Sequence, residues 1–168
     1  DFTRERILNA DATTVSVGYY EGGVYNNYWV LIFSYPENSH TEDYRQEVLN
    51  LVNAQRAKYG LTALEMGDDA LTAAAQTRAE EISVVNSHVR PDGSKCFTVL
   101  KDYGVTDTPT GENAAWGSVS PEEVVNAWMN SEGHRANILN PEARKMSVGY
   151  YYNSNSTWGH QWIQIFTK

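Results

Sequence analysis

The sequence predicts an α+β fold in which helices are layered on an antiparallel sheet. Helical segments with apolar stripes and start signals occupy the middle of the chain. Each end instead holds two strands joined by a turn rich in Gly, Asn or Ser. The length of 168 residues suits one complete domain, and the apolar share of 41% is typical of a globular chain.

The two terminal strand pairs repeat each other. Residues 4–20 read RERILNADATTVSVGYY, and residues 135–151 read RANILNPEARKMSVGYY, with every identity at one constant offset. After a slip of two residues, the segment 29–33 (WVLIF) aligns with 162–166 (WIQIF). We therefore interpret residues 1–41 as the tail of a preceding repeat and residues 42–168 as a complete domain. Asp1 and Thr3 align with Glu132 and His134, so the first copy lacks an imidazole that the second has.

The first expected strand pair is Val15–Tyr20 with Trp29–Phe33, joined through a turn at Gly22-Gly23. The second is Met146–Tyr152 with Gln161–Thr167. An isolated hairpin is marginally stable in water. We therefore expect the first pair to pack on its own second unit or on another chain, in a domain-swapped or hairpin-mediated dimer.

A linker at Ser34–Thr41 and a series of helices separate the two pairs. The clearest start signal is at Ser120, which is followed by Pro121 and by Glu123 at the third helical position. The expected elements are a helix over Thr41–Tyr59, a helix from Asp68 or Asp69 to Val85, a turn at Pro91-Asp92-Gly93, a short helix over Cys96–Tyr103, a loop over Thr106–Gly111, a helix from Ser120 and a short helix around His134–Leu139.

Composition excludes several classes of function. The net charge of -8 argues against nucleic acid and against a polybasic hold on anionic lipid. No apolar run reaches the length of a membrane span, and residues 1–6 do not resemble a signal peptide. Cys96 is the single cysteine, so an internal disulfide is impossible, and we expect this residue to be small and semi-buried rather than nucleophilic.

Four polar residues at the ends of predicted elements are candidates for one site. His88 follows the second helix, Glu112 follows Gly111, and Glu132 and His134 flank Gly133. Imidazole is a common metal ligand and titrates near neutral pH, and Glu can orient a ring nitrogen or take a proton. Three alternatives stay open: a metal site, a proton-sharing site, or a hydrogen-bonded structural network.

Other catalytic signatures are absent. The sequence contains no His-Glu-x-x-His run, no Gly-x-Ser-x-Gly elbow and no phosphate-binding or dinucleotide-binding glycine motif. These absences exclude the corresponding zinc peptidases, serine hydrolases and nucleotide-binding enzymes.

Several segments in order resemble the bacterial branch of the CAP superfamily, whose domain is also called SCP and which includes cysteine-rich secretory, antigen five and pathogenesis-related proteins. The segments that carry this resemblance are His88-Val89-Arg90-Pro91-Asp92-Gly93, Gly111-Glu112-Asn113-Ala114, Trp128-Met129-Asn130-Ser131-Glu132-Gly133-His134-Arg135-Ala136-Asn137-Ile138-Leu139 and Ser147-Val148-Gly149-Tyr150. The resemblance covers about residues 42–168. The missing disulfides fit the bacterial branch.

The resemblance implies a three-layer α-β-α sandwich with a central antiparallel sheet and an open cleft. It also implies a tetrad of His88, Glu112, Glu132 and His134 in that cleft, with Zn²⁺ or another divalent metal held weakly by His88 and His134. We therefore expect an extracellular or cell-wall-associated domain that binds a small ligand, peptide, glycan or lipid. The alternative is a metal-dependent, peptidase-like hydrolase in which Glu112 or Glu132 acts as general base.

Overall fold

A computed structural model of the chain describes residues 14–34 and 41–168. The chain divides into two compact units, residues 1–39 and residues 40–168. Most of the linker expected at Ser34–Thr41 and the positions of Asp1 and Thr3 lie outside the described residues.

The described part of the first unit is a single β-hairpin. Strands β1 (Thr14–Glu21) and β2 (Asn27–Ser34) pair antiparallel over their whole length. Gly22 and Gly23 in the connecting turn have positive φ angles, which glycine adopts without steric cost. The predicted strand pair and its turn are confirmed.

The second unit contains a four-stranded sheet in the order β3-β5-β6-β4. Strands β4 (Pro109–Trp116), β6 (Gly159–Thr167) and β5 (Lys145–Asn153) are antiparallel neighbours. The two-residue strand β3 (Glu65–Met66) adds a short parallel edge to β5. The predicted second hairpin is therefore β5–β6, and its strand β6 lies inside the sheet.

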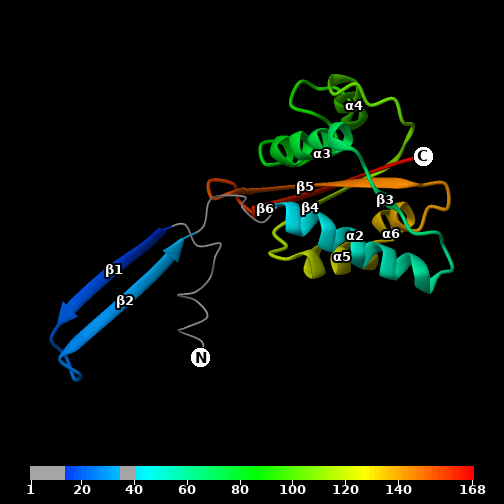
Figure 1. Cartoon of the computed structure of the whole chain (residues 1–168). Helices are drawn as coiled ribbons and strands as arrows, with labels where there is room; N and C mark the ends of the chain where they lie inside the picture. Colours follow the sequence, from blue (N-terminus) through cyan, green and yellow to red (C-terminus); the bar gives the residue numbers. More distant parts are fainter. Residues whose placement is uncertain (1–13, 35–40) are drawn as a thin grey trace. The chain divides into compact units, whose positions relative to one another are not determined.

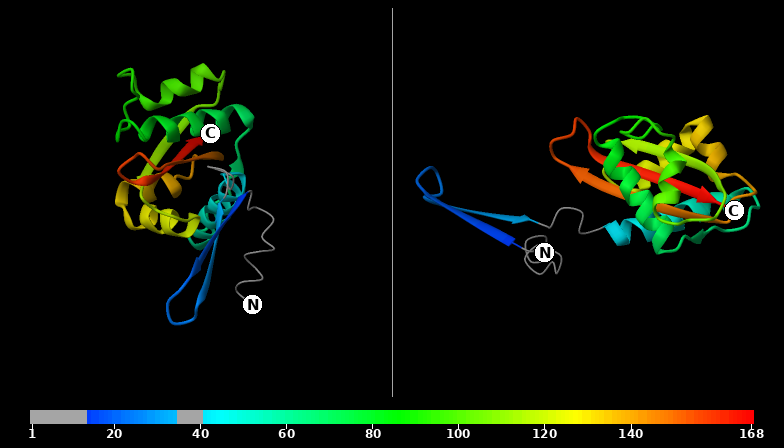
Figure 2. Two further views of the ribbon diagram at one scale, coloured as in Figure 1. Left: turned by 90° about the vertical axis from the view of Figure 1, so that its left-hand side faces the viewer. Right: turned by 90° about the horizontal axis from the view of Figure 1, so that it is seen from above.

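Helices cover both faces of this sheet (Figures 1 and 2). One layer consists of α2 (Thr41–Lys58), α5 (Pro121–Asn130) and α6 (Glu132–Ile138). The other consists of α3 (Asp69–Ile82), the short 3-10 helix η1 (Cys96–Thr98) and α4 (Val99–Asp102). The expected three-layer α+β sandwich is confirmed.

Alternation along β6 links the two layers. Trp162 and Phe166 belong to the apolar core beneath α2 and α5, whereas Ile163 and Ile165 belong to the core beneath α3 and α4. Successive side chains of a strand point to opposite faces. This explains why β6 reads as an almost continuous apolar run.

The helix starts follow the predicted capping signals. The Asp68 carboxylate accepts a hydrogen bond from the Leu71 backbone N–H at 2.9 Å, and the Ser120 hydroxyl accepts one from the Glu123 N–H at 3.3 Å. Such caps satisfy backbone donors that have no partner inside the helix. They fix where α3 and α5 begin.

The segment around Glu112 differs from the prediction. We expected a loop over Thr106–Gly111 with Glu112 just after it, but the structure places residues 109–116 in strand β4, with Glu112 in its interior. Its Gly, Asn and Ala residues have low strand propensity. Pairing with β6 decides the conformation here, and a single-sequence pattern does not reveal such a partner.

Candidate functional site

His88 and Glu112 form the centre of the candidate site. His88 lies after α3, and its ring atom Nδ1 is 2.7 Å from Oε1 of Glu112 on β4. The Glu112 side chain is only 2% exposed, whereas that of His88 is 55% exposed. The His88 imidazole is thus held by a buried carboxylate, while much of its surface is accessible to solvent.

Arg78 of α3 also holds the Glu112 carboxylate. Its Nε and Nη2 atoms donate hydrogen bonds to the two Glu112 oxygens at 3.0 and 3.3 Å. Nη1 of Arg78 also donates to Glu81 at 2.6 Å, and Glu81 in turn accepts from Arg90 at 2.9 Å. A chain of alternating charges therefore fixes Glu112, which matters because a buried carboxylate needs such partners.

These contacts set the protonation states of the pair. Burial raises the pKa of Glu112, but the hydrogen bonds from His88 and Arg78 outweigh it and leave that pKa below its ordinary value. The hydrogen bond to Glu112 raises the pKa of His88. An ionised carboxylate can only accept hydrogen bonds, so Nδ1 of His88 carries the proton. Nε2 of neutral His88 is then left with a free lone pair.

His134 lies in the first turn of α6. Three side-chain amides, which we call the amide clamp, attach this helix to β4. Asn113 donates one hydrogen bond to the His134 carbonyl at 3.1 Å and another to the Gln164 side chain at 3.0 Å. Asn137 donates to the carbonyl of Glu112 at 3.2 Å and to the Asn113 side chain at 2.8 Å. These three amides, Asn113, Asn137 and Gln164, link the backbones that carry Glu112 and His134.

Two further features position α6. The guanidinium of Arg56 on α2 is buried and donates to the Ile138 carbonyl at 2.7 Å and to the Asn140 carbonyl at 2.9 Å, which satisfies the end of the helix. On β4, a Cβ on Gly111 would come within 2.6 Å of the Asn137 side chain. Glycine at this position therefore leaves room for the amide clamp.

The two imidazoles influence each other. Burial lowers the pKa of His134, and the charge of His88 lowers it further. His134 is therefore neutral at neutral pH, which is the form that binds a metal. No hydrogen bond to the His134 imidazole occurs within the part of the chain that the structure describes, so its lone pair is not used by another group.

Glu132, the fourth predicted member, lies at the start of α6 and is exposed. Over residues 14–34 and 41–168 it makes no hydrogen bond or ion pair. The structure therefore unites His88 and Glu112 by a direct contact and brings His134 into their electrostatic range. The place of Glu132 in the same site stays a prediction.

A metal bound here would have few protein ligands. Among the described residues, no group of three or more His, Cys, Asp or Glu side chains has the arrangement of a metal site. Two neutral imidazoles are suitable donors for Zn²⁺, with water in the other positions. Cys96 cannot add a ligand readily, because burial raises the pKa of its thiol to about 11 and so disfavours the thiolate.

Sequence reasoning missed Arg78, Asn137 and Gln164 as parts of the site. Arg78 lies within the predicted helix from Asp68 or Asp69 to Val85, and no role in the site was expected for it. The available signal was an arginine among small and apolar helix residues, because an arginine that is buried needs an acidic partner. Asn137 lies within the family-like segment 128–139, but nothing in the residue spacing reveals its hydrogen bond to β4.

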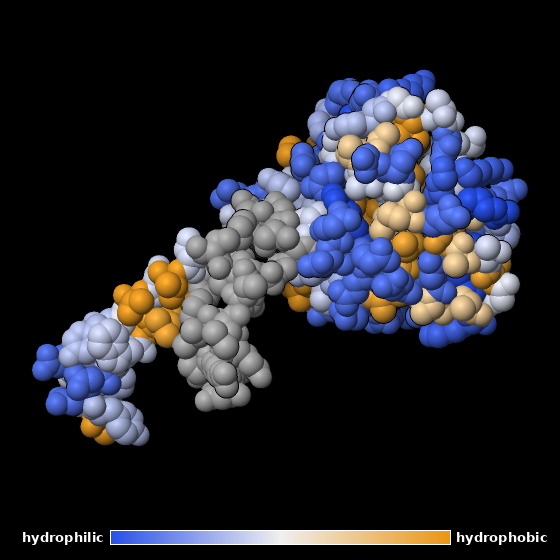
Figure 3. Space-filling view, viewed as in Figure 1, coloured by the Kyte–Doolittle hydropathy of each residue, from blue (hydrophilic) through white to orange (hydrophobic). Residues whose placement is uncertain are grey.

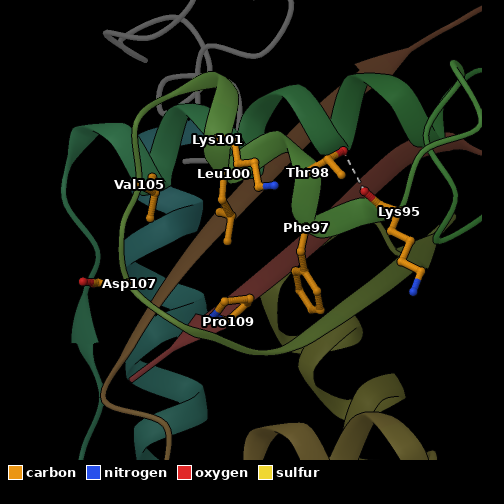
Figure 4. Close-up of a pocket in the computed structure, with 8 residues that line it drawn as sticks. All are labelled: Lys95, Phe97, Thr98, Leu100, Lys101, Val105, Asp107 and Pro109. Atoms are coloured by element: carbon orange, nitrogen blue, oxygen red, sulfur yellow. Dashed lines mark hydrogen bonds between the residues drawn. The ribbon is translucent and has the colours of Figure 1, made fainter.

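A separate cavity of about 340 Å³ lies between η1, α4 and the start of β4 (Figure 4). Phe97, Leu100, Val105 and Pro109 line it, so its walls are mainly apolar. It shares no residue with the tetrad. The cleft that the family resemblance implies around His88 and His134 is not this cavity.

Comparison with known proteins identifies the family of this chain. The model of the cysteine-rich secretory protein family, CAP, matches residues 49–166, which include all four candidate residues. The chain belongs to the CAP family. Within the described residues, no helix is long and apolar enough to cross a membrane.

Two Bacillus subtilis (strain 168) proteins are similar in sequence to this CAP domain. YkwD is 42% identical over 122 residues, which is 71% of this chain and 47% of YkwD. The membrane protein YlbC is 33% identical over 115 residues, which is 66% of this chain and 33% of YlbC. The chain thus spans about half, or a third, of the length of these relatives.

Solved structures share the CAP fold. An extracellular protein containing an SCP domain from Bacillus anthracis str. Ames has a TM-score of 0.68 at 24% identity, with 83% of this chain and 47% of that chain covered. An outer surface protein from Borrelia burgdorferi has a TM-score of 0.68 at 23% identity, with 79% of this chain and 96% of that chain covered.

Proposed function

We propose that the CAP domain is a binding module that holds a divalent metal weakly between His88 and His134 and takes its ligand beside them. The observation that carries this proposal is the hydrogen bond of 2.7 Å between His88 Nδ1 and Glu112. A carboxylate on one ring nitrogen fixes the tautomer and orients the other nitrogen toward a metal. Glu112 is itself fixed by Arg78, so the orientation is built into the fold.

The chemistry of the donors supports weak binding. Two imidazoles leave several coordination positions to water, whereas catalytic zinc sites commonly have three protein ligands. A bound Zn²⁺ would supply a Lewis acid and an acidified water. Glu112 is committed to Arg78 and His88 and is a poor general base there. A binding role is therefore the better supported function, and a peptidase-like hydrolase is the alternative.

We also propose that the domain acts outside the cytoplasm. The similar structures from Bacillus anthracis and Borrelia burgdorferi are described as an extracellular and an outer surface protein. Protease treatment of intact cells that produce the protein tests this location. Digestion of the native chain without loss of a cytoplasmic marker is expected, and full protection on intact cells together with absence from the medium would refute it.

Calorimetric titration with Zn²⁺ tests the metal site. We expect binding in the native protein and loss of the signal in both His88→Ala and His134→Ala. His160→Ala is the matched control, because His160 hydrogen-bonds to Tyr150 at 2.8 Å and belongs to no tetrad position. Far-UV circular dichroism of each variant separates lost binding from lost folding.

The outcomes distinguish three functions. If Zn²⁺ gives no heat of binding with the native protein, the metal proposal is wrong, and the candidate site is only a hydrogen-bonded structural network. Heat together with hydrolysis of a peptide library that stops on chelation favours the hydrolase. Heat without turnover supports the binding module.

A further inference from the structure

The hairpin β1–β2 has the same strand register as β5–β6. Gly18 is opposite Val30 and Tyr19 is opposite Trp29 in the first hairpin. Their sequence equivalents, Gly149 with Ile163 and Tyr150 with Trp162, are opposite each other in the second. The repeat seen in the sequence is therefore also a repeat of backbone pairing, which similar composition alone would not produce.

Side-chain packing within the two hairpins also agrees. The rings of Tyr19 and Trp29 have centroids 4.6 Å apart, and those of Tyr150 and Trp162 are 4.5 Å apart. Cross-strand aromatic pairs of this kind stabilise a particular register. The apolar residues of β2 also keep the order of those in β6.

The surroundings of β5–β6 show what such a hairpin needs. Helix α3 crosses it so closely that a Cβ on Gly149 would overlap the Ala75 carbonyl. On the other face, Tyr44 of α2 stacks on Trp162 with centroids 5.4 Å apart. Strand β4 pairs with the outer edge of β6. A helix on each face, β4 along one edge and the two-residue β3 at the other complete the hairpin.

Within the described residues of the first unit, β1–β2 has no such helix or edge strand. Trp29 is 68% exposed where its equivalent Trp162 is fully buried, and Val17 is 58% exposed where Val148 is fully buried. Apolar residues gather on the surface of the hairpin in Figure 3. A Cβ on Gly18 would make only an ordinary contact, 3.8 Å from the Cβ of Val30, so the hairpin by itself does not require glycine at this position. An exposed apolar surface and strand edge of this kind marks a binding face.

We propose that β1–β2 is the closing hairpin of a preceding CAP-like unit, and that the helices and edge strand of that unit cover it. One helix would cross at Gly18, a second would stack on Trp29, and one strand would pair along the free edge of β2. The occupant is identified by equivalence, because α3, α2 and β4 around β5–β6 define the shape that fits a hairpin of this register.

The same alignment indicates that the preceding unit lacks the metal site. Leu31 of β2 stands where β6 has Gln164, so it cannot accept the hydrogen bond that fixes Asn113 in the second unit. Thr3, outside the described residues, stands where the second unit has His134. The preceding unit would therefore lack the amide clamp and the second imidazole, and would serve as a structural partner.

Hydrogen exchange measured by mass spectrometry tests the proposal on the complete chain and on an extended chain. The extension places a copy of residues 41–131 directly before Asp1, which preserves the spacing because Asp1 aligns with Glu132. We expect the amides of β2 to exchange rapidly in the 168-residue chain and to become about as protected as those of β6 in the extended chain.

Two variants control the experiment. Gly18→Val should abolish protection of β2 in the extended chain, because the helix cannot then approach, and should change nothing in the original chain or in β6. A second extended chain, with residues 14–34 replaced by residues 145–167, reports the protection that a fitting hairpin receives.

Two results would overturn the proposal. In one, β2 stays unprotected in the extended chain while the replacement hairpin is protected. In the other, β2 of the original chain is already protected and sedimentation shows a dimer, which makes a second copy of this chain the occupant.

Discussion

The hairpins β1–β2 and β5–β6 share register and an aromatic pair, yet one is exposed and the other forms the centre of a domain. The difference shows that such a hairpin cannot bury its apolar side chains without other elements packed on it. In the second unit, two helical layers and β4 bury it, and the same layers carry His88, Glu112 and His134. Folding and the candidate site thus depend on the same packing.

The largest contrast is expected at the two equivalent glycines. Gly149→Val should cost about 4–5 kcal/mol or more, because the new side chain overlaps the Ala75 carbonyl and α3 cannot move freely. Gly18→Val should leave the unfolding of the CAP domain unchanged. Urea denaturation followed by circular dichroism measures both. Equal effects of the two substitutions would contradict the comparison.

The equivalent tryptophans give the next contrast. Trp162 is fully buried and its indole N–H donates to the Ser118 carbonyl at 2.7 Å, so Trp162→Ala should cost about 3–5 kcal/mol. Trp29→Ala should not alter the domain's stability. Thermal unfolding of both variants checks this, and a large loss in Trp29→Ala would mean that the exposed hairpin stabilises the domain.

Exchanging the residues that differ between the hairpins should affect the site. Gln164→Leu gives β6 the residue of β2 and removes an acceptor from Asn113, which should cost about 1–3 kcal/mol. Because Asn113 also holds the His134 carbonyl, we expect weaker Zn²⁺ binding. Urea denaturation and calorimetry measure the two effects. Leu31→Gln is the control, and unchanged Zn²⁺ affinity in a destabilised Gln164→Leu would refute the positional link.

The smallest expected effect is a dependence of stability on pH. The hydrogen bond to Glu112 raises the pKa of His88 above its unfolded value of about 6.5. Its stabilising contribution is therefore complete below about pH 6.5 and is lost as pH rises through the folded pKa. Burial of the imidazole and the positive charge of Arg78 nearby reduce this gain.

Melting temperatures of the native protein and of His88→Gln, recorded with a chelator from about pH 5.5 to pH 8.5, measure this contribution. The native protein should lose its advantage over the variant as pH rises. An advantage that grows with pH would show that the pKa of His88 is lowered.

Local signals predicted much of the fold. The caps at Asp68 and Ser120 located the starts of α3 and α5. Apolar alternation located the paired strands. These signals lie within a few residues of the elements they define. Strand β4 was missed because its conformation comes from pairing with β6, about fifty residues further along the chain.

The candidate site shows the same division. Family motifs named four candidate residues, of which the structure joins His88 to Glu112 by a hydrogen bond. They gave no hint that Arg78 fixes Glu112 or that Asn113 and Gln164 connect α6 to the sheet. Such contacts join elements that are distant in sequence. The exposed position of Glu132, without a partner among the described residues, was likewise not foreseen.

Long-range ¹⁵N NMR of the histidine rings during Zn²⁺ titration tests the central claim most directly. The account predicts that neutral His88 carries its proton on Nδ1, and that Zn²⁺ shifts a ring nitrogen of both His88 and His134 while His160 is unaffected. Protonation of His88 on Nε2, or a metal response confined to His160, would contradict it.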